Sequence, residues 1–168
     1  MRWLIDGYNV IRRDPELQSH EAAGLEAGRS ALLRLLARVA AKVSDDFTVV
    51  FDGARRTGGA PSAGRVQVVF SRPPETADDV LRRLAVSLRE GAVVVTSDRA
   101  VQDSVRRAGA VAVGAEAFVE AATTPDDASD DASKDVEDDD TPPRRGPSRR
   151  PSREARDAAR VLRRLRFR

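Results

Sequence analysis

The sequence predicts an α/β protein in which a mainly parallel sheet carries helices on both faces. Two observations lead to this fold class. Several short segments are apolar almost throughout, which is typical of parallel strands buried on both faces. Segments with apolar residues at helical spacing largely alternate with them, as in chains built from strand–helix–strand units. The connections in such units are right-handed in nearly all known proteins.

The first half of the chain supplies two strands and a long helix. Residues 3–5 form an apolar run that ends abruptly on Asp6. Residues 21–43 then place leucine and valine on one face at helical spacing, which predicts an amphipathic helix. Residues 47–51 form a second continuous apolar strand, and this strand ends on Asp52.

The second half continues the alternation. Residues 54–65 are rich in glycine and arginine and are interpreted as a loop before a third strand at 66–70. A helix is expected after Thr76, because Thr76 can cap it and Asp79 stands three residues later, as in a capping box. The remaining elements are a strand at 92–96 followed by Ser97 and Asp98, a helix at 99–108, a short strand at 110–113 and a helix at 116–122.

Composition divides the chain into three regions. Residues 1–122 hold the elements above, which predicts one domain. Residues 123–151 are mostly Asp, Ser, Pro and Arg with almost nothing to bury, so we expect a disordered linker. The net charge of +2 conceals nine acidic side chains within 126–140 and eleven arginines within 144–168. Residues 152–168 regain helical spacing and predict an arginine-rich amphipathic helix that could form on docking.

Composition also excludes several classes of function. The chain contains no cysteine, which excludes a disulfide framework and a thiolate metal site and fits the cytoplasm, where we expect the protein. No apolar run approaches the roughly 20 residues of a membrane span. The loops GxGxxG and GxxxxGK[ST], which bind nucleotide phosphates, are missing. The single histidine, His20, has no GxSxG partner.

Carboxylates at the strand ends are the strongest functional signal. Asp6, Asp52 and Asp98 each follow or close an apolar strand. Asp78 and Asp79 begin a helix that is expected at the same edge. Because parallel strands point the same way, these side chains should converge at one end of the sheet. Crowded carboxylates raise one another's pKa, and oxygen ligands suit Mg²⁺ or Mn²⁺, so we predict a divalent-metal site.

Each of these acids also has a structural interpretation that the sequence leaves open. Asp6 could cap a following helix, and Asp52 could only shape a turn. One of Asp78 and Asp79 could be a helix-start residue favoured by the helix dipole. Asp103 is a further acid that could pair with a neighbouring arginine on an exposed face instead.

Four segments resemble the motifs of YacP-like NYN-domain proteins, a group within the PIN-like nuclease superfamily. They are DGYNVI at 6–11, VVFD at 49–52, VFS and ETAD within 69–78, and TSD at 96–98, in the same order. The resemblance covers about residues 1–120. It implies a three-layer α/β/α fold and a divalent-metal-dependent endoribonuclease that hydrolyses RNA phosphodiester bonds. Some bacterial members look like ribosome-associated enzymes, so the implied substrates include RNA on the ribosome and structured RNA.

The same resemblance implies roles for single residues. The implied ligands of Mg²⁺ or Mn²⁺ are Asp6, Asp78 and Asp98. Asn9 matches the family's polar residue beside the metal and completes the implied catalytic set. Asp52 matches a position with a less uniform role, and Asp79 falls outside the ETAD match, so Asp78 is the preferred ligand of that pair.

Basic and aromatic residues near the same edge are the expected RNA contacts. They are Tyr8, Arg55, Arg56, Arg65 and Arg99. Tyr8 could stack on a base, and the arginines could contact phosphates or be ordinary solvated loop charge. The main alternative function is a non-catalytic RNA-binding or ribosome-docking module, against which the acidic set argues, because unneeded carboxylates would weaken RNA binding. A phosphatase-type hydrolase is disfavoured because the DxDx[TV] motif is absent.

Overall fold

The sheet has five strands in the order β3-β2-β1-β4-β5, and all neighbours are parallel. The computed structural model describes residues 1–53, 64–124 and 152–166. The strands are β1 (Arg2–Asp6), β2 (Asp46–Phe51), β3 (Val66–Phe70), β4 (Ala92–Val95) and β5 (Val111–Val113). This arrangement confirms the predicted α/β fold class with a parallel central sheet.

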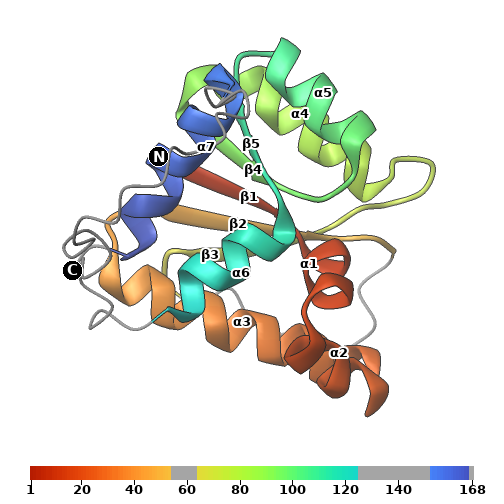
Figure 1. Cartoon of the computed structure of the whole chain (residues 1–168). Coiled ribbons are helices and arrows are strands. Elements are labelled where there is room, and N and C mark those ends of the chain that lie inside the picture. The colour runs from red at the N-terminus through yellow and green to blue at the C-terminus, as the bar shows by residue number, and fades with distance from the viewer. Residues whose placement is uncertain (54–63, 125–151, 167–168) are drawn as a thin grey trace, which may run out of the picture.

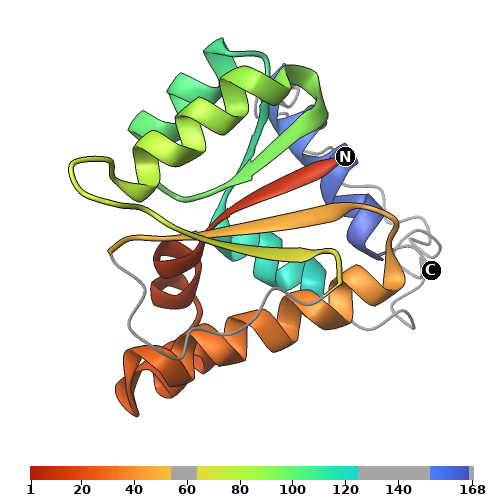
Figure 2. The same ribbon diagram turned by 180° about the vertical axis from the view of Figure 1, so that it is seen from behind.

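Helices cover both faces of the sheet, as Figures 1 and 2 show. They are α1 (Gly7–Arg13), α2 (Pro15–Ala22), α3 (Leu25–Lys42), α4 (Ala77–Leu88), α5 (Arg99–Arg107), α6 (Ala115–Thr123) and α7 (Arg153–Arg166), with a 3₁₀ turn at Arg89–Gly91. Helices α4 and α5 pack on the face to which Leu4 points. The other helices lie on the opposite face, where Trp3 and Ile5 point. Because side chains of β1 point alternately to the two faces and both faces are buried, all of residues 3–5 must be apolar.

The N-terminal helices differ from the sequence prediction. The helix expected at 21–43 begins at Leu25, after Gly24 with φ of 136°. Two shorter helices precede it: α1, which the sequence offered only through the capping interpretation of Asp6, and α2, which was not predicted. Helix α2 buries only Leu17, so it lacks the apolar stripe on which the prediction relied. Its start does carry sequence signals, because Asp14 caps it and Pro15 is its first residue.

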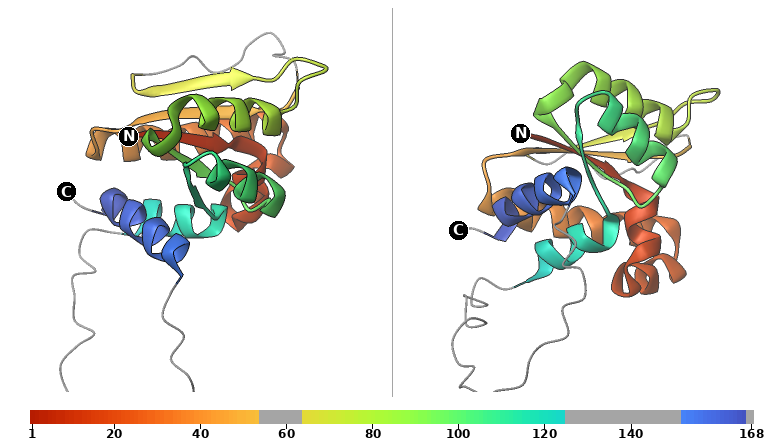
Figure 3. Two further views of the ribbon diagram at one scale, coloured as in Figure 1. Left: turned by 90° about the horizontal axis from the view of Figure 1, so that it is seen from above. Right: turned by 45° about the horizontal axis from the view of Figure 1, so that its top comes forward.

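Helix α7 packs on the domain beside α6 and β5 (Figure 3). Val161 and Leu165 join the same core cluster as Trp3, while Ala155 and Ala159 are exposed. The helical spacing of this segment predicts a buried line through Ala155, Ala158, Ala159, Leu162 and Leu165, which is wrong at Ala155 and Ala159 and misses the buried Val161. Most of the expected linker, 123–151, lies outside the described residues. None of the helices in the described part of the chain is long and apolar enough to cross a membrane.

The strand order places a topological switch point between β1 and β4. The chain leaves β1 toward β2 and β3, then returns across the sheet to β4 and β5 on the other side of β1. Ligands of open α/β sheets bind outside the carboxyl ends of the strands at such a point. Asp6 ends β1 and Thr96 follows β4 there, so the fold itself brings these two residues together.

Candidate functional site

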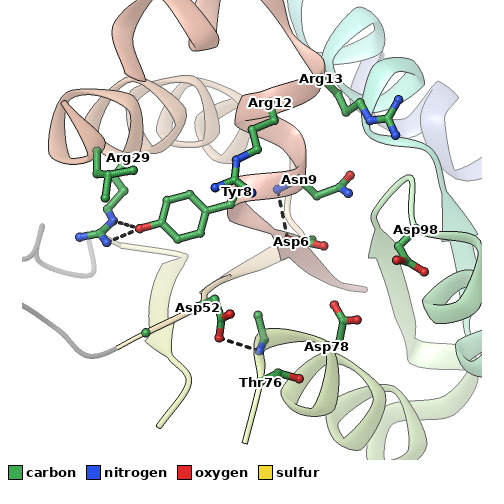
Figure 4. A pocket seen from close by; sticks show the side chains of 13 residues that line it. Asp6, Tyr8, Asn9, Arg12, Arg13, Arg29, Asp52, Thr76, Asp78 and Asp98 are labelled. Atoms are coloured by element: carbon green, nitrogen blue, oxygen red, sulfur yellow. Dashed lines mark hydrogen bonds between the residues drawn. The ribbon is translucent and has the colours of Figure 1, made fainter. Parts of the chain in front are cut away.

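A cleft of about 830 Å³ lies at the carboxyl ends of the strands (Figure 4). It is lined by Asp6, Tyr8, Asn9, Arg12, Arg13, Leu25, Arg29, Asp52, Gly53, Thr76, Ala77, Asp78 and Asp98. One cavity thus contains the predicted acids at three strand ends, the acid at the start of α4 and the predicted amide: Asp6, Asp52, Asp98, Asp78 and Asn9. The carboxylates of Asp6, Asp78 and Asp98 face a common space, with arginines on the other side.

Asp6 sits at the bottom of the cleft and is almost completely buried, with 8% of its surface exposed. It caps α1, because its Oδ1 accepts the backbone N–H of Asn9 at 3.3 Å. Helix α1 can begin at once because Gly7 has no Cβ, which would collide with the Phe51 ring. Burial raises the pKa of Asp6 to about 6, although the hydrogen bond from Asn9 lowers it. Asp6 therefore caps α1, as one interpretation of the sequence expected, and also lines the cleft, as the other expected.

Thr96 connects Asp6 to Asp98. Its hydroxyl donates to Asp6 Oδ2 at 3.0 Å and accepts the backbone N–H of Asp98 at 3.2 Å. Asp98 in turn caps α5 by accepting the Val101 N–H at 3.1 Å. The buried Thr96, directly after β4, thus fixes the carboxylate of Asp6 and the backbone of Asp98, while the cap of α5 fixes the carboxylate of Asp98.

Asp78 and Asp79, neighbours in the sequence, occupy different environments. Asp79 is half exposed and completes the predicted capping box with Thr76, since its carboxylate accepts from the Thr76 N–H and hydroxyl. Those hydrogen bonds lower the pKa of Asp79. Asp78 faces the cleft, and burial followed by the charges of Asp98, Asp79 and Asp52 raises its pKa against the effect of Arg82, 3.6 Å away. Asp78 thus lines the cleft and Asp79 does not.

Asp52 holds the start of α4 at the cleft. Its Oδ1 accepts the Ser71 hydroxyl at 2.6 Å and the Ala77 N–H at 3.3 Å. The same hydroxyl accepts the Gly53 N–H at 3.1 Å. Asp52 therefore has a structural role beside its place in the cleft, as the turn interpretation allowed.

Asn9 is oriented by a network that the sequence did not reveal. Its Oδ1 accepts the backbone N–H of Ser97 at 2.8 Å, so its NH₂ group is the end left for a ligand. The Ser97 hydroxyl donates to Glu116 Oε2 at 2.5 Å, and that hydrogen bond lowers the pKa of Glu116. Glu116 also pairs with Arg13 at 3.4 Å. Ser97 stands in the TSD motif, but nothing in the sequence links Glu116 to it.

Tyr8 lies in the cleft wall, between arginines. The guanidinium groups of Arg12 and Arg29 both lie 5.4 Å from the centre of its ring, and its hydroxyl accepts from Arg29 Nε at 2.8 Å. Arg12, Arg13 and Arg29 were not among the predicted RNA contacts. Arg12 and Arg13 directly follow the DGYNVI segment, whereas only the packing of α3 against α1 brings Arg29 to the cleft.

The remaining predicted residues lie elsewhere. Arg99 is exposed beside Asp98 but does not line the cleft. The prediction that Arg65 lies near the cleft is wrong. Arg65 precedes β3 and donates to the Val43 carbonyl at 2.6 Å, so it lies at the edge of the sheet opposite the cleft. Asp103 is exposed and pairs with Arg106 at 3.2 Å. The other two predicted arginines, Arg55 and Arg56, lie outside the described residues.

The acids in the cleft fit a divalent cation by their chemistry. Asp6, Asp78 and Asp98 supply only oxygen, which Mg²⁺ and Mn²⁺ prefer. Burial and the neighbouring carboxylates raise the pKa of Asp6 and of Asp78, so their ionised forms are costly without a partner, and a cation in the cleft would stabilise them. Within the described residues, no three acidic or histidine side chains stand close enough together to form a ready-made metal site. Side-chain adjustment on binding is therefore required.

Two solved structures resemble this fold. Both are crystal structures of Rae1 (YacP) from Bacillus subtilis. The first aligns with a TM-score of 0.64 and 29% sequence identity and covers 73% of each chain. The second, of a single-substitution mutant, aligns with a TM-score of 0.61 and 28% identity over 73% of this chain and 74% of the other.

Sequence comparison gives the same relationship. The uncharacterized protein YacP of Bacillus subtilis (strain 168) is 33% identical over 113 aligned residues; the match covers 64% of this chain and 66%, just under two thirds, of that relative's length. The family model of the YacP-like NYN domain matches residues 3–164. That match extends from β1 into α7 and contains every residue of the cleft. The chain therefore belongs to the YacP-like NYN domain family, as the resemblance of its motifs predicted.

Proposed function

We propose that this protein is a divalent-metal-dependent endoribonuclease. Membership in the NYN family carries a PIN-like nuclease fold and an RNA-related function. The observation that supports the finer proposal is the cleft in which Asp6, Asp78 and Asp98 face a common space at the switch point of the sheet. A binding module would gain nothing from carboxylates gathered in one cleft, because they repel RNA phosphates.

In the proposed reaction, each part of the cleft has a separate task. Asp6, Asp78 and Asp98 would hold Mg²⁺ or Mn²⁺, and Asn9 would donate its NH₂ group to a phosphate oxygen or to a carboxylate. A bound divalent ion lowers the pKa of a water and stabilises charge on the leaving oxygen of a phosphodiester. Arg12 and Arg13 stand across the cleft from the acids and offer positive charge to the RNA backbone.

The first prediction is that purified protein cuts single-stranded RNA internally with Mn²⁺ or Mg²⁺ and not with EDTA. Labelled RNA is followed on denaturing gels, both free and bound to ribosomes as mRNA, because the proposed substrates include RNA on the ribosome. Internal cleavage that persists in excess EDTA would contradict metal dependence. RNA that binds but stays intact with every metal, free and on ribosomes, would favour the non-catalytic RNA-binding or ribosome-docking module.

The second prediction separates the two neighbouring acids of α4. Asp78→Asn should reduce cleavage at least about tenfold, because it removes a charged oxygen from the cleft. Asp79→Asn should keep cleavage and only slightly lower the melting temperature, because it weakens the reciprocal hydrogen bonds of the capping box with Thr76. Cleavage rates at saturating Mn²⁺ and melting temperatures are measured for both variants. A larger loss of activity in Asp79→Asn would reverse the assignment.

A further inference from the structure

Arg29 is held in the cleft wall by aromatic rings. Its guanidinium lies 5.4 Å from the ring centre of Tyr8, 5.5 Å from that of Phe51 and 5.3 Å from that of Phe70. The Tyr8 hydroxyl accepts hydrogen bonds from Arg29 Nε and Nη2. One face and one edge of the guanidinium are thus fixed by the protein, while Arg29 remains half-buried at the cleft surface.

The charge of Arg29 is not matched by an acidic partner in the described part of the chain. Among the described residues, no carboxylate lies within salt-bridge distance of Arg29. Arg13 is paired with Glu116 at 3.4 Å, and Arg12 approaches Glu21 only to 4.0 Å. A half-buried cation without an acidic partner costs free energy unless a ligand supplies the anion. If Arg29 served only to pack against Phe51, its charged group would have no reason to face the cleft, yet Arg29 lines it.

Leu25 adds an apolar surface to the same side of the cleft. It is the first residue of α3 and 52% exposed, one of only three large hydrophobic residues that are exposed in the described part of the chain. It lines the cleft together with Arg29, which stands one helical turn later. An exposed aliphatic side chain next to an arginine can pack against a nucleobase while the arginine binds the phosphate of the same nucleotide.

We propose that Arg29 and Arg12, with Arg29 positioned by Tyr8, form a phosphate subsite for a nucleotide adjoining the acidic centre, and that Leu25 contacts its base. The choice of RNA as ligand rests on the proposed function. The subsite favours single-stranded RNA, because a base can reach Leu25 only when it is unstacked and unpaired. Tyr8 is then a positioning residue that acts through Arg29, in place of the base-stacking role expected from the sequence.

The experiment measures affinity for a fluorescent single-stranded RNA oligonucleotide in EDTA, so that cleavage does not enter. Arg29→Gln should weaken binding about tenfold, the worth of one charge-assisted hydrogen bond, and reduce the salt dependence by about one phosphate contact. Arg29→Lys should recover part of the affinity as a point charge. The matched control is Arg34→Gln, on the same helix but lining a different groove, which should stay within about twofold.

Tyr8→Phe tests the positioning role, because it keeps the ring and removes the hydroxyl. It should weaken binding about threefold in the parent chain and have no further effect in Arg29→Gln, since the two side chains act as one unit. Equal losses in Arg29→Gln and Arg34→Gln would overturn the subsite, and additive losses would overturn the role of Tyr8. A duplex that binds as tightly as the single strand would overturn the single-strand preference. If the subsite effects appear in a protein that cuts no RNA, the proposed nuclease function fails and the subsite stands.

Discussion

A protein carrying Asp6→Asn is expected to lose at least about 100-fold in RNA cleavage and yet to unfold at a higher temperature than the parent chain at pH 7.5 without divalent cations. The loss follows from removing a charged oxygen at the centre of the acidic set. The gain follows from burial, since the ionised carboxylate of Asp6 is held where only 8% of the residue is exposed. A substitution that abolishes activity by damaging the fold would lower the melting temperature instead, so the combination separates a lost site residue from a lost fold.

The sign of the pH effect follows from the raised pKa of Asp6. It is about 6 in the folded protein against 3.8 for an ordinary aspartate. Between these values the folded state binds more protons than the unfolded state, so the stability due to Asp6 falls as pH rises from about 4 to 6. Above that window the ionised group destabilises the fold by up to about 3 kcal/mol. The Asn variant avoids most of this cost, about 1–3 kcal/mol or roughly 3–9 °C in melting temperature.

Melting curves at pH 5 and 7.5, with and without Mn²⁺, check the prediction. The difference between the two proteins should shrink at pH 5, where the parent chain takes up the proton. Added Mn²⁺ should stabilise the parent chain by mass action and the variant much less. A variant that melts below the parent at both pH values, or that cleaves RNA equally well with Mn²⁺, would refute the assignment of Asp6.

The second large effect is expected far from the cleft, in α7. Leu165→Ala should destabilise the protein by about 2–4 kcal/mol, the usual cost of truncating a buried leucine, and lower the melting temperature by about 5–15 °C. Leu165 is only 4% exposed and belongs to the core cluster that contains Trp3 and Phe118. Arg164, beside it, donates to the buried carboxylate of Asp45 at 3.1 Å.

Thermal unfolding of Leu165→Ala is compared with that of Arg163→Ala, which removes an exposed side chain from the same helix. The control should melt within about a degree of the parent chain, as exposed substitutions usually do. RNA cleavage measured well below the melting temperature should survive in both, because every proposed metal ligand precedes α6. An unchanged melting temperature for Leu165→Ala would show that α7 contributes nothing to the fold in solution.

Sequence patterns predicted the parts of this fold that depend on local physical rules. The apolar strands, the Thr76–Asp79 capping box and the position of Asp98 after β4 all follow from residues close together in the chain. The convergence of Asp6, Asp78 and Asp98 followed from one further rule, that parallel strands end at the same edge. These are properties that neighbouring residues dictate without knowledge of how helices pack.

What the sequence did not predict depends on contacts between distant elements. Arg29 reaches Tyr8 only because α3 packs against α1, and Glu116 reaches Ser97 only because α6 begins beside β4. Arg65 was placed at the wrong edge because its position depends on where the loop before β3 returns to the sheet. Val161 was missed because the helical phase of α7 is set by the surface that it covers.

The hydroxyl of Thr96 affects how firmly the carboxylates of the cleft are held before an ion binds. The Asp98 N–H, the Thr96 hydroxyl and the Asp6 carboxylate form a chain of hydrogen bonds that all point one way. This chain holds the Asp6 carboxylate, and the N–H of Val101 holds that of Asp98, so both side chains lose rotamer entropy when the protein folds, before any ion arrives. Among the described residues Asp78 pairs only with the half-exposed Arg82, 3.6 Å away, and it keeps more of that freedom. The cleft thus combines a preorganised pair of carboxylates with one adjustable carboxylate. Asp78 is therefore the side chain that would adjust to ions of different radius.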